Sequence, residues 1–198
     1  PHPKGLPVAR MAVCEYYRRW DVRLDPEQIV LTASTSEAYS FLLKLLCNPG
    51  DSVLVPQPSY PLLEYLCQLN DVQAVPYRLM YDGEWRIDLD SLRIQLSSHS
   101  RAIILVHPNN PTGSFVTGDE EKAVLNLAKE HNLSLIADEV FLEFDFGVAT
   151  NRVRTFASTE AVLTFTLGGI SKLLGLPQMK LGWVVVSGPS GKQTEALR

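Results

Sequence analysis

The sequence lacks the features of a membrane protein or of a disulfide-stabilised secreted protein. No apolar run approaches the roughly 18 residues that a membrane-spanning helix needs. The three cysteines, Cys14, Cys47 and Cys67, are odd in number and form no CxxC pair, which argues against a zinc ribbon or a disulfide framework. We therefore expect reduced cysteines in a cytoplasmic protein, with no metal and no membrane partner.

An excess of positive charge is also missing. The chain has 18 Lys and Arg against 22 Asp and Glu, for a net charge of −4, so a general nucleic-acid surface is not expected. Hydrophobic residues make up 45% and charged residues 20%, an ordinary balance for a globular protein. With 198 residues, the chain can form one large domain or two small ones and can bury a sizeable core.

What the sequence does have is an alternation of expected strands and helices. Several strand segments are apolar on consecutive positions, which favours strands buried on both faces of a parallel sheet. The expected strands are Ile29–Thr32, Ser52–Pro56, Val72–Arg78, Ala102–His107, Leu133–Ala137, Ala161–Thr166 and Gly182–Ser187. The expected helices are Val8–Trp20, Ser36–Cys47, Tyr60–Leu69, Asp88–Leu96 and Asp119–His131. This order predicts an α/β fold with three layers, a doubly wound and mostly parallel seven-stranded sheet.

Ligands of such sheets bind beyond the carboxyl ends of the strands, so the loops there are the first candidates for a site. Ser34, Thr35 and Ser36 follow the first expected strand and lead into a helix. Hydroxyls beside the free N–H groups of a helix start suit a phosphate, although a simple N-cap has the same pattern. Tyr60 stands in a proline-stiffened turn after the second strand, where it would stack on a flat ligand or pack in the core.

Three later loops also carry reactive or hydrogen-bonding side chains. The run His107–Gly113 is either a structural turn or a loop in which the amide of Asn110 donates to a ligand oxygen. Asp138 directly follows the apolar run Leu133–Ala137, where a carboxylate needs a cation or a donor, unless it caps a helix. Lys172 lies among glycines and apolar residues after the sixth strand. It is either a snorkelling surface residue or a desolvated amine able to form imines.

Taken together, these loops resemble the fold-type I aminotransferases of class I/II, which depend on pyridoxal 5'-phosphate (PLP). Residues 109–113 (Asn-Asn-Pro-Thr-Gly) look like the family's Asn-Pro-Thr-Gly motif, and residues 137–140 look like its Asp-Glu-x-Tyr segment. Residues 171–175 look like its Ser-Lys-x-x-Gly lysine motif, and the Gly-Trp pair at 182–183 follows as in the family. Each motif alone is modest, but their shared order and spacing cover nearly the whole chain.

The resemblance implies a role for each candidate residue. Lys172 would form the internal aldimine with PLP and then move a proton between the substrate α-carbon and the cofactor, while Asp138 would pair with the pyridine nitrogen. Asn110 would donate to the phenolic oxygen. Tyr60 and Val140 would pack on the two faces of the cofactor ring. The phosphate would be bound by Ser34, Thr35, Ser36 and Lys180.

The sequence departs from the family pattern at three positions. Phe141 stands where the family usually has a tyrosine that bonds the phenolic oxygen, and Gly169 stands where it has a serine or threonine phosphate ligand. Lys180 stands where the family has an arginine, which keeps the charge but loses the bidentate fork. A thinner phosphate site is therefore expected, with either weaker PLP binding or compensation by residues outside the fragment.

The resemblance also implies the substrates, the oligomeric partner and the part of a longer protein that this chain represents. The expected reaction transfers an amino group between an amino acid and a 2-oxo acid in a homodimer. Residues 1–198 would be the PLP-binding large domain, a fragment without the N-terminal arm and the C-terminal small domain, and close to inactive alone. Two alternatives remain open from the sequence. One is other PLP chemistry on this fold, such as a C–S lyase or a decarboxylase, and the other is a PLP-sensing regulatory domain.

Overall fold

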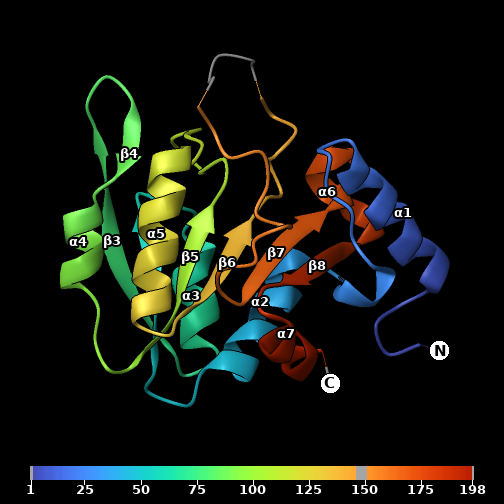
Figure 1. Cartoon of the computed structure of the whole chain (residues 1–198), viewed down its shortest axis with the longest axis horizontal. Helices are drawn as coiled ribbons and strands as arrows, with labels where there is room; N and C mark the ends of the chain where they lie inside the picture. The colour runs from blue at the N-terminus through green and yellow to red at the C-terminus, as the bar shows by residue number, and fades with distance from the viewer. Residues whose placement is uncertain (1, 146–150, 198) are drawn as a thin grey trace.

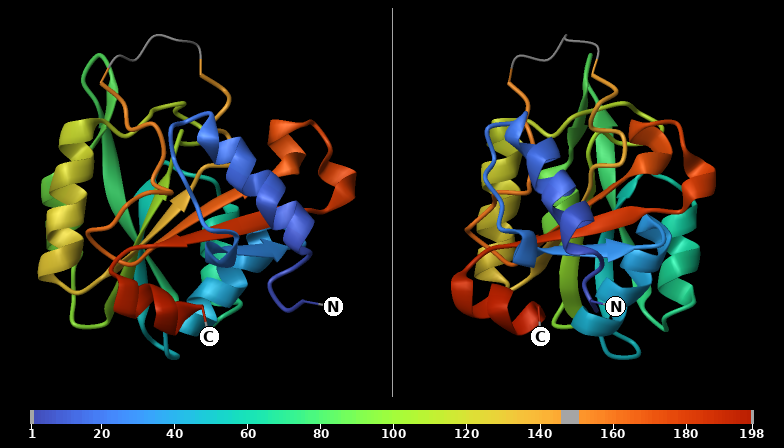
Figure 2. Two further views of the ribbon diagram at one scale, coloured as in Figure 1. Left: turned by 45° about the vertical axis from the view of Figure 1, so that its right-hand side comes forward. Right: turned by 90° about the vertical axis from the view of Figure 1, so that its right-hand side faces the viewer.

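The computed structural model describes residues 2–145 and 151–197, which form an eight-stranded sheet with helices on both faces (Figure 1 and Figure 2). The strand order is β1-β8-β7-β6-β5-β2-β3-β4. The strands are β1 (Ile29–Thr32), β2 (Ser52–Gln57), β3 (Gln73–Tyr81), β4 (Trp85–Ile87), β5 (Ser100–Val106), β6 (Ser134–Asp138), β7 (Thr164–Gly169) and β8 (Gly182–Ser187). The helices are α1 (Pro7–Arg18), α2 (Thr35–Leu46), α3 (Leu62–Gln68), α4 (Leu89–Ile94), α5 (Gly118–Glu130), α6 (Ile170–Leu173) and α7 (Ser190–Ala196), with 3-10 turns η1 (Pro26–Gln28) and η2 (Pro177–Met179).

The predicted α/β fold is confirmed, and the predicted count of seven strands is wrong. Strands β3, β2, β5, β6 and β7 run parallel, whereas β8 is antiparallel to both β7 and β1. The additional strand is β4, which turns back antiparallel onto β3 at the edge of the sheet. It has only three residues, with the exposed Arg86 at its centre, so it shows no strand pattern long enough to recognise.

Consecutive apolar residues in the central strands are buried because helices cover both sheet faces. Val53 and Ile104 face a core completed by Leu43 of α2, whereas Leu54 faces the opposite core with Val124 of α5. All five side chains are almost fully buried. Burial of one such side chain is worth about 1.5–3 kcal/mol, so the two cores hold the strand ends in fixed relative positions.

A third core lies under α1 and supports the end of β7. The indole nitrogen of Trp183 donates to the hydroxyl of Tyr17 at 3.3 Å, and both side chains are buried. The Trp183 ring lies so close to Gly168 that a Cβ added there would meet it at 2.5 Å. Glycine at position 168 therefore lets α1 and β8 close against β7 just before α6.

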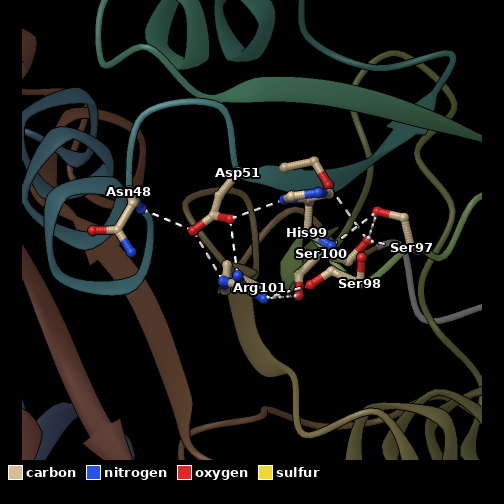
Figure 3. Close-up of polar contacts among 8 residues, drawn as sticks. Asn48, Asp51, Ser97, Ser98, His99, Ser100 and Arg101 are labelled. Atoms are coloured by element: carbon tan, nitrogen blue, oxygen red, sulfur yellow. Dashed lines mark hydrogen bonds and ion pairs between the residues drawn. The ribbon is translucent and has the colours of Figure 1, made fainter.

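At the amino ends of the strands, a polar cluster joins the starts of β2 and β5 (Figure 3). The buried carboxylate of Asp51 accepts a hydrogen bond from the Asn48 N–H at 2.9 Å and pairs with the Arg101 guanidinium at 2.9 Å. The Asn48 N–H and the Arg101 guanidinium hold the pKa of Asp51 below its usual value. Arg101 also donates to the Ser98 carbonyl at 2.9 Å, so this end of the sheet is closed by internal contacts.

None of the helices within residues 2–145 and 151–197 has the length and apolar character needed to cross a membrane.

Candidate active site

A cavity of about 330 Å³ opens at the carboxyl ends of the strands, and all nine predicted site residues line it. These residues come from the start of α2, the turn before α3, the loop after β5, the end of β6, α6 and the segment after η2. They are Ser34, Thr35, Ser36, Tyr60, Asn110, Asp138, Val140, Lys172 and Lys180. The fold thus brings together side chains that are far apart in the sequence, while their individual roles stay predictions.

Asp138 is the last residue of β6 and places a carboxylate at the floor of this cavity. The Tyr39 hydroxyl donates to its Oδ2 at 3.0 Å, and the Val140 N–H donates to its Oδ1 at 3.2 Å. Burial raises the pKa of Asp138 to about 6, although both hydrogen bonds favour the ionised form. Among the residues that the structure describes, no cation pairs with Asp138, so the site has capacity for one positively charged donor from a ligand.

Tyr39 is a site residue that sequence reasoning missed. It lies on the buried face of α2, where an aromatic residue is typical of core packing, and only 3% of it is exposed. A buried tyrosine hydroxyl normally has a hydrogen-bond partner. A tyrosine at a core position was therefore the one sequence signal that indicated a polar neighbour. The structure shows that this partner is the Asp138 carboxylate.

Glu139 was also missed, and it anchors the end of β6 from behind the cavity. Its buried carboxylate accepts hydrogen bonds from the Thr155 hydroxyl at 2.7 Å and the Phe156 N–H at 2.6 Å. Burial raises the pKa of Glu139 to about 8. These contacts tie residue 139 to the segment that precedes β7, which holds the neighbouring Asp138 in place.

Lys172 lies in the short helix α6 rather than in an open loop, directly after β7. Its side chain is exposed at the cavity wall, which agrees with the surface-residue reading of Lys172 and not with the desolvated-amine reading. Its Nζ atom lies 5.6 Å from the centroid of the Phe141 ring. At this distance the aromatic face attracts an ammonium group, so Phe141 helps to position the amine.

The start of α2 forms the end of the cavity that suits an anion. The Ser34 hydroxyl caps the helix by accepting from the Glu37 N–H at 3.1 Å, so the N-cap reading of Ser34 holds. Thr35 and Ser36 occupy the first turn, where backbone N–H groups have no partner within the helix. Lys180 lines the same cavity with a left-handed backbone, at φ 50°.

Gly169 also lines the cavity, and the sheet explains why no side chain is present there. It faces Gly182 across the β7–β8 pair. A Cβ at position 169 would lie 3.2 Å from the Leu181 carbonyl oxygen. A serine or threonine at this position would require the Leu181 carbonyl to shift by a few tenths of an ångström.

The loop after β5 presents Asn110 and is held by its neighbours. Asn109 donates to the Pro58 carbonyl at 3.1 Å and to the Thr112 hydroxyl at 2.9 Å. The buried His107 ring accepts from the Val116 N–H at 3.0 Å, and burial lowers its pKa to about 4, so it is neutral near pH 7. Within the described ranges the Asn110 amide makes no hydrogen bond of its own, so it can donate into the cavity.

Comparison with known proteins places these features in context. The family described as aminotransferase class I and II matches residues 1–197. Glutamate-pyruvate aminotransferase AlaA of Escherichia coli strain K12 is 32% identical over 187 residues, which cover 94% of this chain and 46% of that protein. Nicotianamine aminotransferase 1 of Oryza sativa subsp. japonica is 32% identical over 190 residues, or 96% of this chain and 38% of that protein.

Solved structures show the same correspondence in three dimensions. An alanine aminotransferase from Pyrococcus furiosus superposes with a TM-score of 0.89 at 28% identity, over 100% of this chain and 51% of that chain. An aminotransferase from Escherichia coli superposes with a TM-score of 0.88 at 30% identity, again over 100% of this chain and 50% of the other. The chain therefore spans about half the length of the relatives that it matches.

Proposed function

The chain belongs to the aminotransferase class I and II family, and we propose that it binds PLP and transfers an amino group between an amino acid and a 2-oxo acid. One observation carries this proposal: a carboxylate, an amide, a lysine amine and a helix start converge on one cavity at the carboxyl edge. These groups match the polar features of PLP, which are its ring nitrogen, phenolic oxygen, aldehyde and phosphate.

The donor set of the cavity fits this cofactor. Asp138 supplies a partly buried carboxylate that accepts two hydrogen bonds and has no cationic partner among the described residues. A protonated pyridine nitrogen could therefore pair with it. Thr35 and Ser36 supply N–H and hydroxyl groups for the phosphate, and Lys180 supplies a positive charge. When bound, PLP supplies an electron-withdrawing ring that stabilises negative charge at the α-carbon of the substrate.

Each protein group then has a defined task. The amine of Lys172 would hold the cofactor covalently and would carry a proton to and from the substrate α-carbon. Asp138 would keep a proton on the ring nitrogen, and the amide of Asn110 would donate to the phenolic oxygen. Tyr60, which is 50% exposed, and Val140 cover the two faces of the ring and limit contact with water.

The proposal also covers the type of reaction, the oligomeric state and the cellular compartment. The relatives that match are named as aminotransferases, which supports amino transfer over a lyase or decarboxylase reaction. We regard residues 1–198 as the PLP-binding large domain of a homodimer. The three free cysteines support a reducing, cytoplasmic setting.

The proposal is tested by a single-turnover experiment on the PLP-loaded 198-residue chain. After addition of an amino acid, absorbance and mass spectrometry would follow conversion of the cofactor to pyridoxamine phosphate and release of the 2-oxo acid. We expect slow conversion in the wild type and none in Lys172→Ala, whereas Lys129→Ala on the exposed surface of α5 should match the wild type. Conversion that is absent from the wild type, or unchanged in Lys172→Ala, would contradict the proposal.

A further inference from the structure

A second and larger cavity, of about 840 Å³, lies beside the Lys172 cavity. Its walls are the β3–β4 hairpin, the loop after β5 and described residues on both sides of positions 146–150. Figure 1 shows the hairpin and the segment after β6 at the same end of the sheet. Asn110 and Phe141 line both cavities, so the larger one begins where the smaller one ends. We call the larger cavity the aromatic groove.

The aromatic groove is named for the five rings that line it. They belong to Tyr81, Trp85, Phe115, Phe141 and Phe144. Ring centroids lie 5.4 Å apart in the Tyr81–Trp85 pair and 5.5 Å apart in the Phe141–Phe144 pair, so two ring pairs stand in the lining. Tyr81 is 65% exposed and Phe144 is 49% exposed. Large aromatic side chains exposed together in a cavity mark a surface that binds an apolar or aromatic group.

The charged groups of the aromatic groove are paired with one another. Arg86 pairs with Glu84 at 2.8 Å, and Arg152 pairs with Asp145 while its guanidinium lies 4.5 Å from the centroid of the Phe115 ring. Both described arginines of the lining have a carboxylate partner, although the buried Nη1 atom of Arg152 has no hydrogen-bond partner among the described residues. A ligand with a second carboxylate would compete with these acids for the guanidinium groups, whereas a neutral aromatic group would not.

We propose that the aromatic groove binds the side chain of the amino-acid substrate, and that this side chain is large, uncharged and aromatic. The inference rests on the proposed function, because it needs the substrate amine to react in the Lys172 cavity. A substrate held there reaches the groove past Phe141, which lines both cavities. Its ring would then pack against Phe141 and Phe144 and face Tyr81 across the groove, so these residues set specificity and take no part in bond making.

Ligand binding to the PLP-loaded chain tests this proposal without relying on turnover. Isothermal titration would compare 3-phenylpropionate with glutarate, which carries a second carboxylate in place of the ring. We expect 3-phenylpropionate to bind at least about tenfold more tightly, as burial of one ring in an apolar pocket allows. Tyr81→Ala and Phe144→Ala should each reduce this preference several-fold. Tyr65→Ala, which removes a comparably exposed ring from α3, should not change it.

Several outcomes would overturn the inference. Equal or tighter binding of glutarate would exclude the aromatic side chain, and an unchanged preference in both Tyr81→Ala and Phe144→Ala would exclude the groove. The visible absorbance of lysine-bound PLP in the same samples distinguishes failure of the proposed function from failure of the groove as a binding site. A missing band with preserved aromatic preference would contradict the proposed function and support the groove as a ligand site.

Discussion

The hydroxyl of Tyr39 donates a hydrogen bond to Oδ2 of Asp138 at 3.0 Å, across 99 positions of sequence. Tyr39 belongs to α2, the same helix whose first turn lines the anion end of the cavity. One helix therefore supports both ends of the site, the anion end through its N-terminus and the carboxylate end through Tyr39. Since Tyr39 packs in the core and Asp138 is the last residue of β6, the core fixes their separation.

Replacement of Tyr39 by phenylalanine tests this relationship. Loss of the hydroxyl should raise the pKa of Asp138 further above about 6, because that hydrogen bond favours the carboxylate. A hydrogen bond to a charged group is worth about 1.5–3 kcal/mol, so PLP affinity at pH 6 should fall roughly tenfold, with a smaller loss at pH 8. Absorbance titrations at both pH values measure this difference.

The matched control is Tyr77→Phe, which also removes a buried hydroxyl, one that donates to the Ile104 carbonyl at 2.8 Å. It should leave the pH dependence of PLP binding unchanged. An equal loss of affinity in the two variants, or the same loss at pH 6 and pH 8, would contradict the role given to Tyr39.

Asp138→Asn should stabilise the protein without cofactor. Burial raises the pKa of Asp138 from 3.8 to about 6, so the folded state binds this proton more tightly than the unfolded state. The stability of the wild type therefore falls as pH rises from about 4 to about 6 and stays lower above that range. The neutral amide avoids this loss, which amounts to at most about 3 kcal/mol for two pKa units.

Urea unfolding of the unloaded protein at pH 5 and pH 8 checks this prediction. The free energy of unfolding of Asp138→Asn should exceed that of the wild type more at pH 8 than at pH 5. The same variant should bind PLP weakly, because the amide cannot pair with the ring nitrogen. A variant that is less stable than the wild type at pH 8 would argue against a buried carboxylate without a cationic partner at this position.

Phe141→Leu should slow the capture of PLP by Lys172. The Lys172 Nζ lies 5.6 Å from the centroid of the Phe141 ring, where the aromatic face attracts the amine and so positions it. Loss of an interaction of about 0.5–1 kcal/mol corresponds to a rate decrease of roughly two- to fivefold. Stopped-flow absorbance measures this rate, with Phe144→Leu as the control that keeps the Phe141 ring. Capture in Phe141→Leu that is as fast as in the wild type, or faster, would contradict a positioning role for the ring.

Lys180→Arg should tighten PLP binding. Lys180 lines the cavity with its backbone in the left-handed region, and arginine meets the same backbone strain as lysine. A guanidinium can donate two parallel hydrogen bonds to a phosphate, which an ammonium cannot. Equilibrium titration with PLP, and competition by inorganic phosphate, measure the change. Unchanged or weaker binding of PLP would count against a thin phosphate site.

Much of the fold and of the cavity lining was predictable because strand ends converge in a parallel sheet. Asp138 and Asn110 follow buried apolar strands, so their position at one edge follows from the periodicity alone. Lys172 follows β7 for the same reason, but its exposure depends on how α6 turns away from the sheet, and the sequence does not encode that in a local pattern.

The features that escaped prediction depend on contacts between distant segments. Tyr39 has the pattern of a core residue on an amphipathic helix, and only the fold reveals that its hydroxyl meets Asp138. Strand β4 is too short to show a period, and its pairing with β3 brings Tyr81 into the aromatic groove. The groove combines residues from three separated stretches, each of which is unremarkable by itself in the sequence.

The central claim is that Lys172 holds the cofactor, and the most direct measurement is chemical trapping. The protein would be incubated with PLP, reduced with borohydride, digested and mapped by mass spectrometry. The account predicts a phosphopyridoxyl group on Lys172, and none on Lys180, although both residues line the same cavity. Modification at another lysine, or no modification at a concentration at which PLP binds, would contradict it.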